Sequence, residues 1–268
     1  MSTAFNEPAK KHLGQNFLHE RGVIDKIVQA LDPKQGDVIV EIGPGQGALT
    51  FPLLRKHGEL TAIEFDRDLH APLQAAARVH GTLHLIKGDV LGVDFTALAA
   101  ANADADGRIR LVGNLPYNLS SPILFHALDH APVVRDMHFM LQKEVVERMA
   151  CGPGSKVYGR LSVMLQAYCT VTPLFTVPPG AFRPAPKVDS AVVRLVPKPA
   201  VRIEVVDRLV FANVVRAAFG QRRKTLRNAL NGVAETSQIE AAGLRADVRA
   251  EQVAVDGFVR LANLICAE

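Results

Sequence analysis

Short apolar runs alternate with amphipathic stretches from residue 37 onward, and this alternation restricts the fold more than any other feature of the chain. The apolar runs are typical of buried strands, and the stretches between them have helical periodicity. The expected strands are 37–42, 59–64, 82–87, 108–113, 137–141, 167–177 and 190–196. The expected helices are 46–57, 66–79, 119–130, 143–150 and 160–166. This order predicts an α/β fold with a mostly parallel, seven-stranded sheet and helices on both faces.

Proline clusters mark changes in composition at residues 178–180 and 197–199. Every element after the second cluster is expected to be helical, namely 205–219, 222–230, 239–242 and 257–267. We therefore place a domain boundary near residue 199. It divides the chain into an α/β domain of residues 1–198 and a small all-α domain of residues 199–268.

Composition limits the class of protein. No window approaches eighteen consecutive apolar residues, and residues 1–11 contain no apolar segment, so we expect neither a membrane span nor a secretory signal. The three cysteines form no Cys-x-x-Cys pair, as expected in a reducing compartment, and we predict a cytoplasmic protein. A net charge of +4 and a pI near 9.0 favour a polyanionic partner.

A glycine-rich turn follows the first expected strand. Gly43 and Gly45 would let the backbone approach a ligand closely where the next helix begins. Glu64 ends the second strand, 21 residues after Gly43, which is where an acid can bind ribose hydroxyls. Gly43, Gly45 and Ala48 also fit the dinucleotide fingerprint G-x-G-x-x-G/A, so a nicotinamide or flavin enzyme remains an alternative.

Asp89 ends the third expected strand and can accept a hydrogen bond from an adenine amino group. Ligands bind outside the carboxyl ends of parallel strands, so Gly43, Glu64, Asp89 and Asn114 should converge. This set favours S-adenosyl-L-methionine over a dinucleotide. Asp89 could equally serve as the N-cap of the segment that follows it.

The tetrapeptide at residues 114–117 follows the fourth strand and predicts a pocket for a planar amine. The amide oxygen of Asn114 can accept one hydrogen bond from an exocyclic NH2, and a backbone carbonyl held by the ring of Pro116 can accept another. Tyr117 would stack on the ring that carries the amine. The candidate catalytic residues are therefore Asn114, Leu115 and Tyr117, and the expected reaction is in-line transfer of a methyl group to an adenine N6, without a strong general base. An ordinary turn after a strand is the alternative.

Five ordered motifs carry a resemblance to a known family. They are residues 11–18, 41–47, 88–89, 113–118 and 182–190. In order and spacing they resemble the ribosomal RNA adenine dimethyltransferases, and they look most like the bacterial small-subunit members.

The resemblance implies a Rossmann-like class I methyltransferase that dimethylates N6 of two adjacent adenosines in the 3′-terminal hairpin loop of 16S ribosomal RNA. It implies a substrate in the immature 30S subunit, and we expect a monomer. The cofactor contacts that it implies are Asn16, Leu18, Gly43, Gly45, Glu64, Asp89 and Asn114. The aromatic residues that it implies around the target base are Tyr117 and Phe182, although Phe182 could equally be a core residue.

A basic cluster in the small domain is the best candidate for RNA backbone contacts. It consists of Arg216, Arg222, Arg223, Lys224 and Arg227, with no acid among them. A solvated charged face is the alternative interpretation. His126 and His130 have the i, i+4 spacing of metal ligands, but no third ligand is near them in sequence, so we expect no metal.

Two further functions remain open at this point. A large-subunit 23S ribosomal RNA adenine methyltransferase would share the cofactor turn and a similar Asn-x-Pro-aromatic motif. An assembly factor that acts mainly by binding the 30S precursor would use the basic helical domain.

Overall fold

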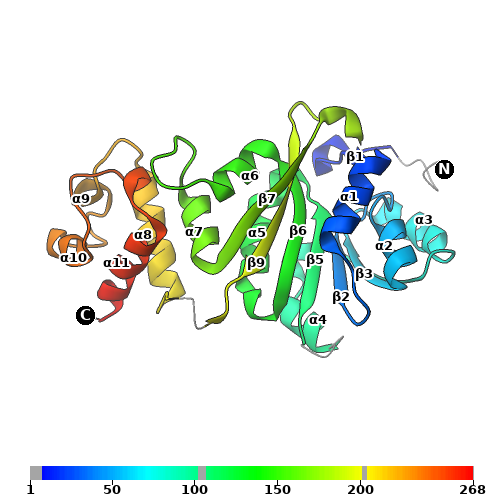
Figure 1. Ribbon diagram of the computed structural model, residues 1–268, viewed down its shortest axis with the longest axis horizontal. Helices are drawn as coiled ribbons and strands as arrows, with labels where there is room; N and C mark the ends of the chain where they lie inside the picture. Colours follow the sequence, from blue (N-terminus) through cyan, green and yellow to red (C-terminus); the bar gives the residue numbers. More distant parts are fainter. Residues whose placement is uncertain (1–7, 102–106, 201–203, 268) are drawn as a thin grey trace. The chain divides into compact units, whose positions relative to one another are not determined.

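Seven strands form the central sheet of the computed structural model, which describes residues 8–101, 107–200 and 204–267 (Figure 1). The strands are β2 (Val38–Ile42), β3 (Glu59–Glu64), β4 (Thr82–Lys87), β5 (Ile109–Asn114), β6 (Val134–Gln142), β7 (Cys169–Val177) and β9 (Ser190–Pro197). Their order is β4-β3-β2-β5-β6-β9-β7. Strands β2 to β6 pair in parallel, and β9 is antiparallel to β6. The predicted mostly parallel seven-stranded sheet is confirmed.

Helices cover both faces of the sheet. Those before β7 are α1 (Arg21–Leu31), α2 (Thr50–His57), α3 (Arg67–Ala77), α4 (Phe95–Ala101), α5 (Ser120–Asp129), α6 (Lys143–Ala150) and α7 (Arg160–Tyr168). The chain after β9 forms four further helices, which belong to a separate compact unit: α8 (Arg208–Gly220), α9 (Leu226–Ala229), α10 (Thr236–Ala241) and α11 (Val255–Ala267). Helix α2 contacts both α1 and α3. Figure 1 shows α1 in front of the sheet and α5 behind it.

Sequence analysis missed α1 and α4. The start of α1 is capped by Glu20, whose carboxylate accepts hydrogen bonds from the backbone N–H groups of Gly22 and Val23. Its buried side chains recur at helical spacing, at Val23, Ile24, Ile27, Val28 and Leu31. This pattern was visible in the sequence. The prediction that the chain has no secretory signal rests partly on residues 1–7, which lie outside the described residues.

A close approach between β2 and β5 brings the ends of the two strands together. A Cβ atom at Gly113 would lie 2.4 Å from the carbonyl oxygen of Ile42, so this position requires glycine. The register pairs Glu41 with Val112. The glycine turn after β2 and Asn114 at the end of β5 therefore lie at the same edge of the sheet.

The chain divides into two compact units, and this division corrects the predicted domain limits. The first unit is Met1–Val146 with Thr172–Pro197, and the second is Glu147–Val171 with Lys198–Glu268. The boundary after Pro197 agrees with the prediction near residue 199, but Glu147–Val171 was assigned to the wrong domain.

The physical reason for the correction is a shared core in the second unit. The buried hydroxyl of Tyr158 donates a hydrogen bond to the carbonyl of Val253 at 3.0 Å, and the Tyr158 ring packs against Phe219. Tyr168 likewise contacts Phe211 edge to face.

None of the helices in the described part of the chain has the length and apolar character needed to span a bilayer.

His138 on β6 is a buried polar residue whose Nδ1 atom lies 3.9 Å from the Asp136 carboxylate. Its side chain is 1% exposed, and neither ring nitrogen has a hydrogen-bond partner among the described residues. Burial lowers the pKa of His138 to about 4; Asp136 opposes this shift, whereas Arg110 and Arg194 add to it.

We expect the substitution His138→Leu to stabilise the protein most at acidic pH. The folded-state pKa lies below the unfolded value of 6.5, so protonation favours the unfolded chain, and stability falls as the pH drops from 6.5 towards 4. The upper limit of this loss is about 3 kcal/mol. Melting temperatures measured between about pH 8 and pH 5 should therefore diverge from those of the wild type as the pH falls. His19→Leu, at an exposed position, is the matched control; a constant difference across this range for His138→Leu would contradict the prediction.

Candidate active site

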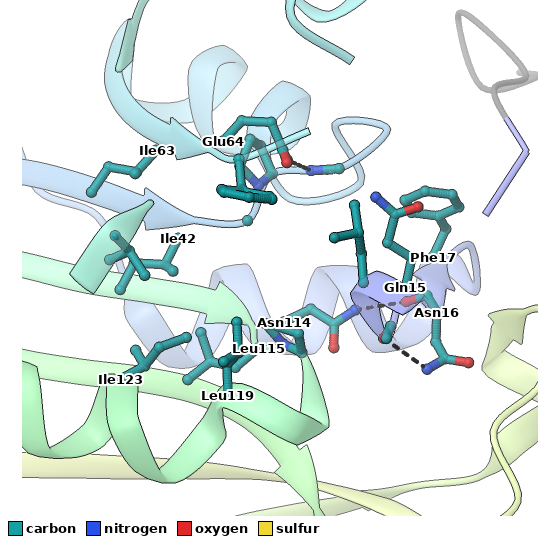
Figure 2. A pocket seen from close by; sticks show the side chains of 18 of the residues that line it. Gln15, Asn16, Phe17, Ile42, Ile63, Glu64, Asn114, Leu115, Leu119 and Ile123 are labelled. Carbon is teal, nitrogen blue, oxygen red and sulfur yellow. Dashed lines mark hydrogen bonds between the residues drawn. The ribbon is translucent and has the colours of Figure 1, made fainter. Parts of the chain in front are cut away.

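A cleft of about 1220 Å³, counted to its open mouth, lies at the carboxyl ends of the central strands (Figure 2). The predicted site residues that line it are Asn16, Leu18, Gly43, Gly45, Glu64, Asp89, Asn114, Leu115 and Tyr117. The structure therefore brings together residues from the N-terminal segment and from the ends of β2, β3, β4 and β5.

Glu64 is held at the end of β3 by two backbone groups. Its Oε2 accepts a hydrogen bond from the N–H of Gly45 at 3.0 Å, and its Oε1 accepts one from the N–H of Asp66 at 2.7 Å. Burial raises the pKa of the Glu64 carboxyl, and these two N–H groups oppose that shift. The carboxylate is thus fixed beside the glycine turn, where its remaining lone pairs can accept hydrogen bonds from ribose hydroxyls.

The turn between β2 and α2 requires glycine at position 45. Gly45 has a φ of +56°, and a Cβ atom there would lie 3.1 Å from the ring of Phe17. An L side chain would therefore strain the backbone and press against the N-terminal segment.

Glu41 is a polar residue of the cleft to which sequence analysis gave no role. It is 1% exposed, and its Oε2 accepts a hydrogen bond from the Thr50 hydroxyl at 2.6 Å. Burial raises the pKa of Glu41 to about 8; the Thr50 hydroxyl opposes this shift and the charge of Glu64 adds to it. A cation bound nearby would favour the ionised form of this carboxyl.

The N-terminal segment at residues 10–18 contacts both sides of the cleft, and Figure 2 shows its contact with Asn114. On one side the Gln15 amide donates a hydrogen bond to Asp66 at 2.9 Å, and Lys10 forms a salt bridge with the same carboxylate. On the other side the Asn114 Nδ2 donates a hydrogen bond to the carbonyl of Asn16 at 2.9 Å. This last bond assigns the amide orientation and leaves the Asn114 oxygen as an acceptor.

The peptide after Asn114 offers a second acceptor. The Pro116 carbonyl already accepts hydrogen bonds from the Leu119 N–H at 3.0 Å and the Ser120 hydroxyl at 3.2 Å. The Leu115 N–H donates to the Met140 carbonyl at 3.1 Å, which fixes the peptide against β6. The Leu115 carbonyl is therefore the candidate second acceptor beside the Asn114 amide oxygen.

Tyr117 lines the cleft, whereas Phe182 does not. The Phe182 side chain is 2% exposed and belongs to the same buried cluster as Leu18. Two short strands, β1 (Phe17–Leu18) and β8 (Phe182–Arg183), pair antiparallel, with Leu18 opposite Phe182. The prediction that Phe182 stacks on a target base is therefore corrected: neighbouring prolines suggested an irregular, open segment, but this strand pairing directs the ring into the core.

Asp89 acts as an N-cap and also lines the cleft. Its Oδ1 accepts a hydrogen bond from the Leu91 N–H at 3.0 Å, which caps a short 3-10 helix, and the residue also lines the cleft.

Sequence analysis overlooked Phe65, which follows Glu64 directly and lines the same cleft. Its side chain is 59% exposed, and so large an exposed aromatic surface in a cleft favours contact with a ligand.

All five residues of the basic cluster, namely Arg216, Arg222, Arg223, Lys224 and Arg227, are exposed and lie in the second unit. They extend from the end of α8 through the following loop into α9. Arg222 donates a hydrogen bond to the Lys156 carbonyl, and Arg216 donates one to the Asn213 side chain.

His126 and His130 have local partners. His126 contacts the Val93 carbonyl, His130 contacts the Thr96 hydroxyl, and both rings pack against Phe95. In the described ranges, no group of three His, Cys, Asp or Glu residues has the arrangement of a metal site.

Comparisons with known proteins agree with this geometry. The family model described as Ribosomal RNA adenine dimethylase matches residues 6–266. The Ribosomal RNA small subunit methyltransferase A proteins of Xanthomonas campestris pv. campestris (strain B100) and Xanthomonas oryzae pv. oryzae (strain PXO99A) are each 70% identical to the chain. Each alignment covers 98% of this chain and 99% of the relative.

Solved structures have the same fold. A dimethyladenosine transferase from Plasmodium falciparum is similar with a TM-score of 0.77 and 26% identity, covering 91% of this chain and 95% of that one. The 23S rRNA methyltransferase ErmE has a TM-score of 0.70 and 23% identity, covering 94% of this chain and 100% of that one.

We expect Glu64→Gln to weaken binding of S-adenosylhomocysteine by about 10- to 100-fold, because an amide cannot replace both charge-assisted acceptor positions. Isothermal titration calorimetry measures the change. Glu59→Gln, at the exposed start of the same strand, is the matched control. A dissociation constant within about twofold of the wild type, in a variant with an unchanged melting temperature, would argue against the assigned role of Glu64.

Proposed function

The chain belongs to the ribosomal RNA adenine dimethylase family, and we propose that it dimethylates N6 of two adjacent adenosines in the 3′-terminal hairpin loop of 16S ribosomal RNA, with S-adenosyl-L-methionine as methyl donor. The main support for the proposal is that a single cleft contains residues suited to the methyl donor and residues suited to the target adenine. The glycine turn and Glu64 suit a nucleoside cofactor, and Asn114, Leu115 and Tyr117 suit an adenine.

The residues present fit the cofactor. Glu64 can bind the ribose hydroxyls, Asp89 can accept from the adenine amino group, and Phe65 offers an exposed aromatic face beside them. Backbone groups of Gly43 and Gly45 can approach the methionine portion. We also assign cofactor contacts to Asn16 and Leu18, which line the same cleft. When bound, S-adenosylmethionine supplies an electrophilic methyl group on a positively charged sulfur.

The target amine is activated by position and hydrogen bonding. The Asn114 amide oxygen and the Leu115 carbonyl accept the two N6 hydrogens, which directs the nitrogen lone pair towards the methyl carbon. Tyr117 stacks on the purine. The nitrogen becomes acidic only after it has attacked, so its proton passes to solvent and no strong base is required. Methyl transfer would leave a neutral thioether, S-adenosylhomocysteine, in the cofactor site.

The small-subunit substrate is favoured over the large-subunit one by the relatives. Proteins named for the small subunit are 70% identical over nearly the whole chain, whereas the 23S rRNA methyltransferase ErmE is 23% identical and shows the fold alone. Incubation of immature 30S and of 50S particles with tritiated S-adenosylmethionine, followed by mapping of modified nucleosides, tests this choice. Label confined to 23S RNA would overturn it.

We expect Asn114→Ala to reduce methyl transfer at least about 100-fold, because the N6 amine loses a preorganised acceptor. Single-turnover transfer to immature 30S particles measures the rate of the chemical step. Gln35→Ala removes an exposed carboxamide outside the cleft and serves as the control. Transfer within about threefold of the wild-type rate would show that Asn114 does not activate the amine.

We also propose that the basic cluster of the second unit binds the RNA backbone, and that the protein acts as a monomer on the immature 30S subunit in the cytoplasm during ribosome biogenesis. Support comes from five exposed cations on contiguous elements, a pI near 9.0 and the ribosomal RNA family. Binding to phosphates adds affinity that falls steeply with salt.

The triple variant Arg223→Gln, Lys224→Gln, Arg227→Gln should bind 16S RNA more weakly. The slope of log affinity against log salt should fall by roughly 0.7 to 0.9 for each phosphate that the variant no longer neutralises. Filter binding at several salt concentrations measures both effects. The matched control neutralises three exposed cations of the first unit, Arg67, Arg78 and Lys87. Equal reductions in affinity for the two triple variants would indicate only a general effect of net charge.

A further inference from the structure

The hydroxyl of Tyr117 forms a hydrogen bond with a buried serine of strand β9. Tyr117 begins a single turn of 3-10 helix at Tyr117–Leu119, directly after β5 and Pro116. Its hydroxyl oxygen lies 2.6 Å from the Oγ atom of Ser190, which is 73 residues away in sequence and has no exposed surface. Ser190 is the first residue of β9 and the last of the motif at residues 182–190, to which no role has yet been assigned.

The serine itself is fixed by the sheet. Ser190 pairs with Gln142 in the antiparallel ladder between β6 and β9. The preceding carbonyl, that of Asp189, accepts a hydrogen bond from the Lys143 N–H at 2.9 Å. The far end of the Tyr117 ring is therefore attached to the central sheet of the first unit, although its backbone lies in a short turn.

The contact suits a neutral tyrosine. Burial raises the pKa of Tyr117, and the hydrogen bond to Ser190 opposes this shift. The phenol remains protonated at neutral pH, so either hydroxyl can donate to the other. Loss of the Ser190 hydroxyl would leave the ring free to change its tilt, and a stacked base depends on that tilt.

We propose that Ser190 is a positioning residue for methyl transfer, which fixes the plane of the Tyr117 ring against the target adenine without touching the substrate. This inference rests on the proposed function, since it assumes that Tyr117 stacks on the target base. It assigns to the motif at residues 182–190 a role behind the cleft, which agrees with the burial of both Phe182 and Ser190.

A double-mutant cycle tests the proposal. The variants are Ser190→Ala, Tyr117→Phe and the double variant, with immature 30S particles as substrate. Each single change should lower kcat about five- to tenfold, as expected for loss of one hydrogen bond, and leave binding of S-adenosylhomocysteine unchanged. The double variant should be no slower than Tyr117→Phe alone, because both changes remove the same link. Multiplied losses, or a wild-type kcat for Ser190→Ala, would overturn the proposal.

A spectroscopic readout separates positioning from a general loss of structure. An RNA hairpin with 2-aminopurine at the target position should lose fluorescence when the base stacks on Tyr117, and Ser190→Ala should restore part of it. Ser162→Ala removes an equally buried serine hydroxyl in the second unit and should change neither kcat nor fluorescence. If Ser190→Ala fails to fold, Tyr117→Phe alone must show the same partial loss of quenching, and unchanged quenching would refute the proposal.

Different results would refute the proposed function and the role of Ser190. A wild-type protein that transfers no methyl group to 30S particles would refute the proposed function. An active wild-type protein whose Ser190→Ala variant keeps full kcat and full quenching would refute only the role of Ser190.

Discussion

The parallel pairing of β2 with β5 is the constraint on which the site depends. Because Gly113 has no side chain, β5 approaches the Ile42 carbonyl closely enough to bring the turn after β2 beside Asn114. In the proposed function, a cofactor at the turn and an adenine at Asn114 would face each other across this one cleft. Catalysis that relies on proximity depends on this backbone geometry more than on any reactive side chain.

The N-terminal segment completes the cleft by linking its two halves. Gln15 and Lys10 bind Asp66, whose own N–H is bound by Glu64, and the Asn16 carbonyl accepts a hydrogen bond from Asn114. The segment therefore links the end of β3, through Asp66, to Asn114 at the end of β5. Its own regular structure is only a two-residue strand and a short 3-10 helix, so these side-chain contacts hold it in place.

The sequence predicted the parts of the structure that depend on local pattern. The strands, the glycine turn and the acid of β3 follow from periodicity and spacing, and the residues placed at strand ends do meet in one cleft. Contacts between distant segments were not visible in this way. Phe182 is buried because of its pairing with Leu18, and Glu147–Val171 joins the second unit because Tyr158 packs there. No local pattern encodes either contact.

The first and the second methyl transfer depend differently on the hydrogen-bond acceptors of the base pocket and on the Tyr117 ring. An unmodified N6 carries two hydrogens and can satisfy both acceptors, the Asn114 oxygen and the Leu115 carbonyl. After the first transfer only one hydrogen remains, so one acceptor has no partner and hydrogen bonding orients the amine less strongly. Stacking on Tyr117 does not depend on the number of hydrogens on N6. If Ser190 fixes the Tyr117 ring as proposed, its hydroxyl should matter most for the second methyl group, when the base has lost part of its polar recognition.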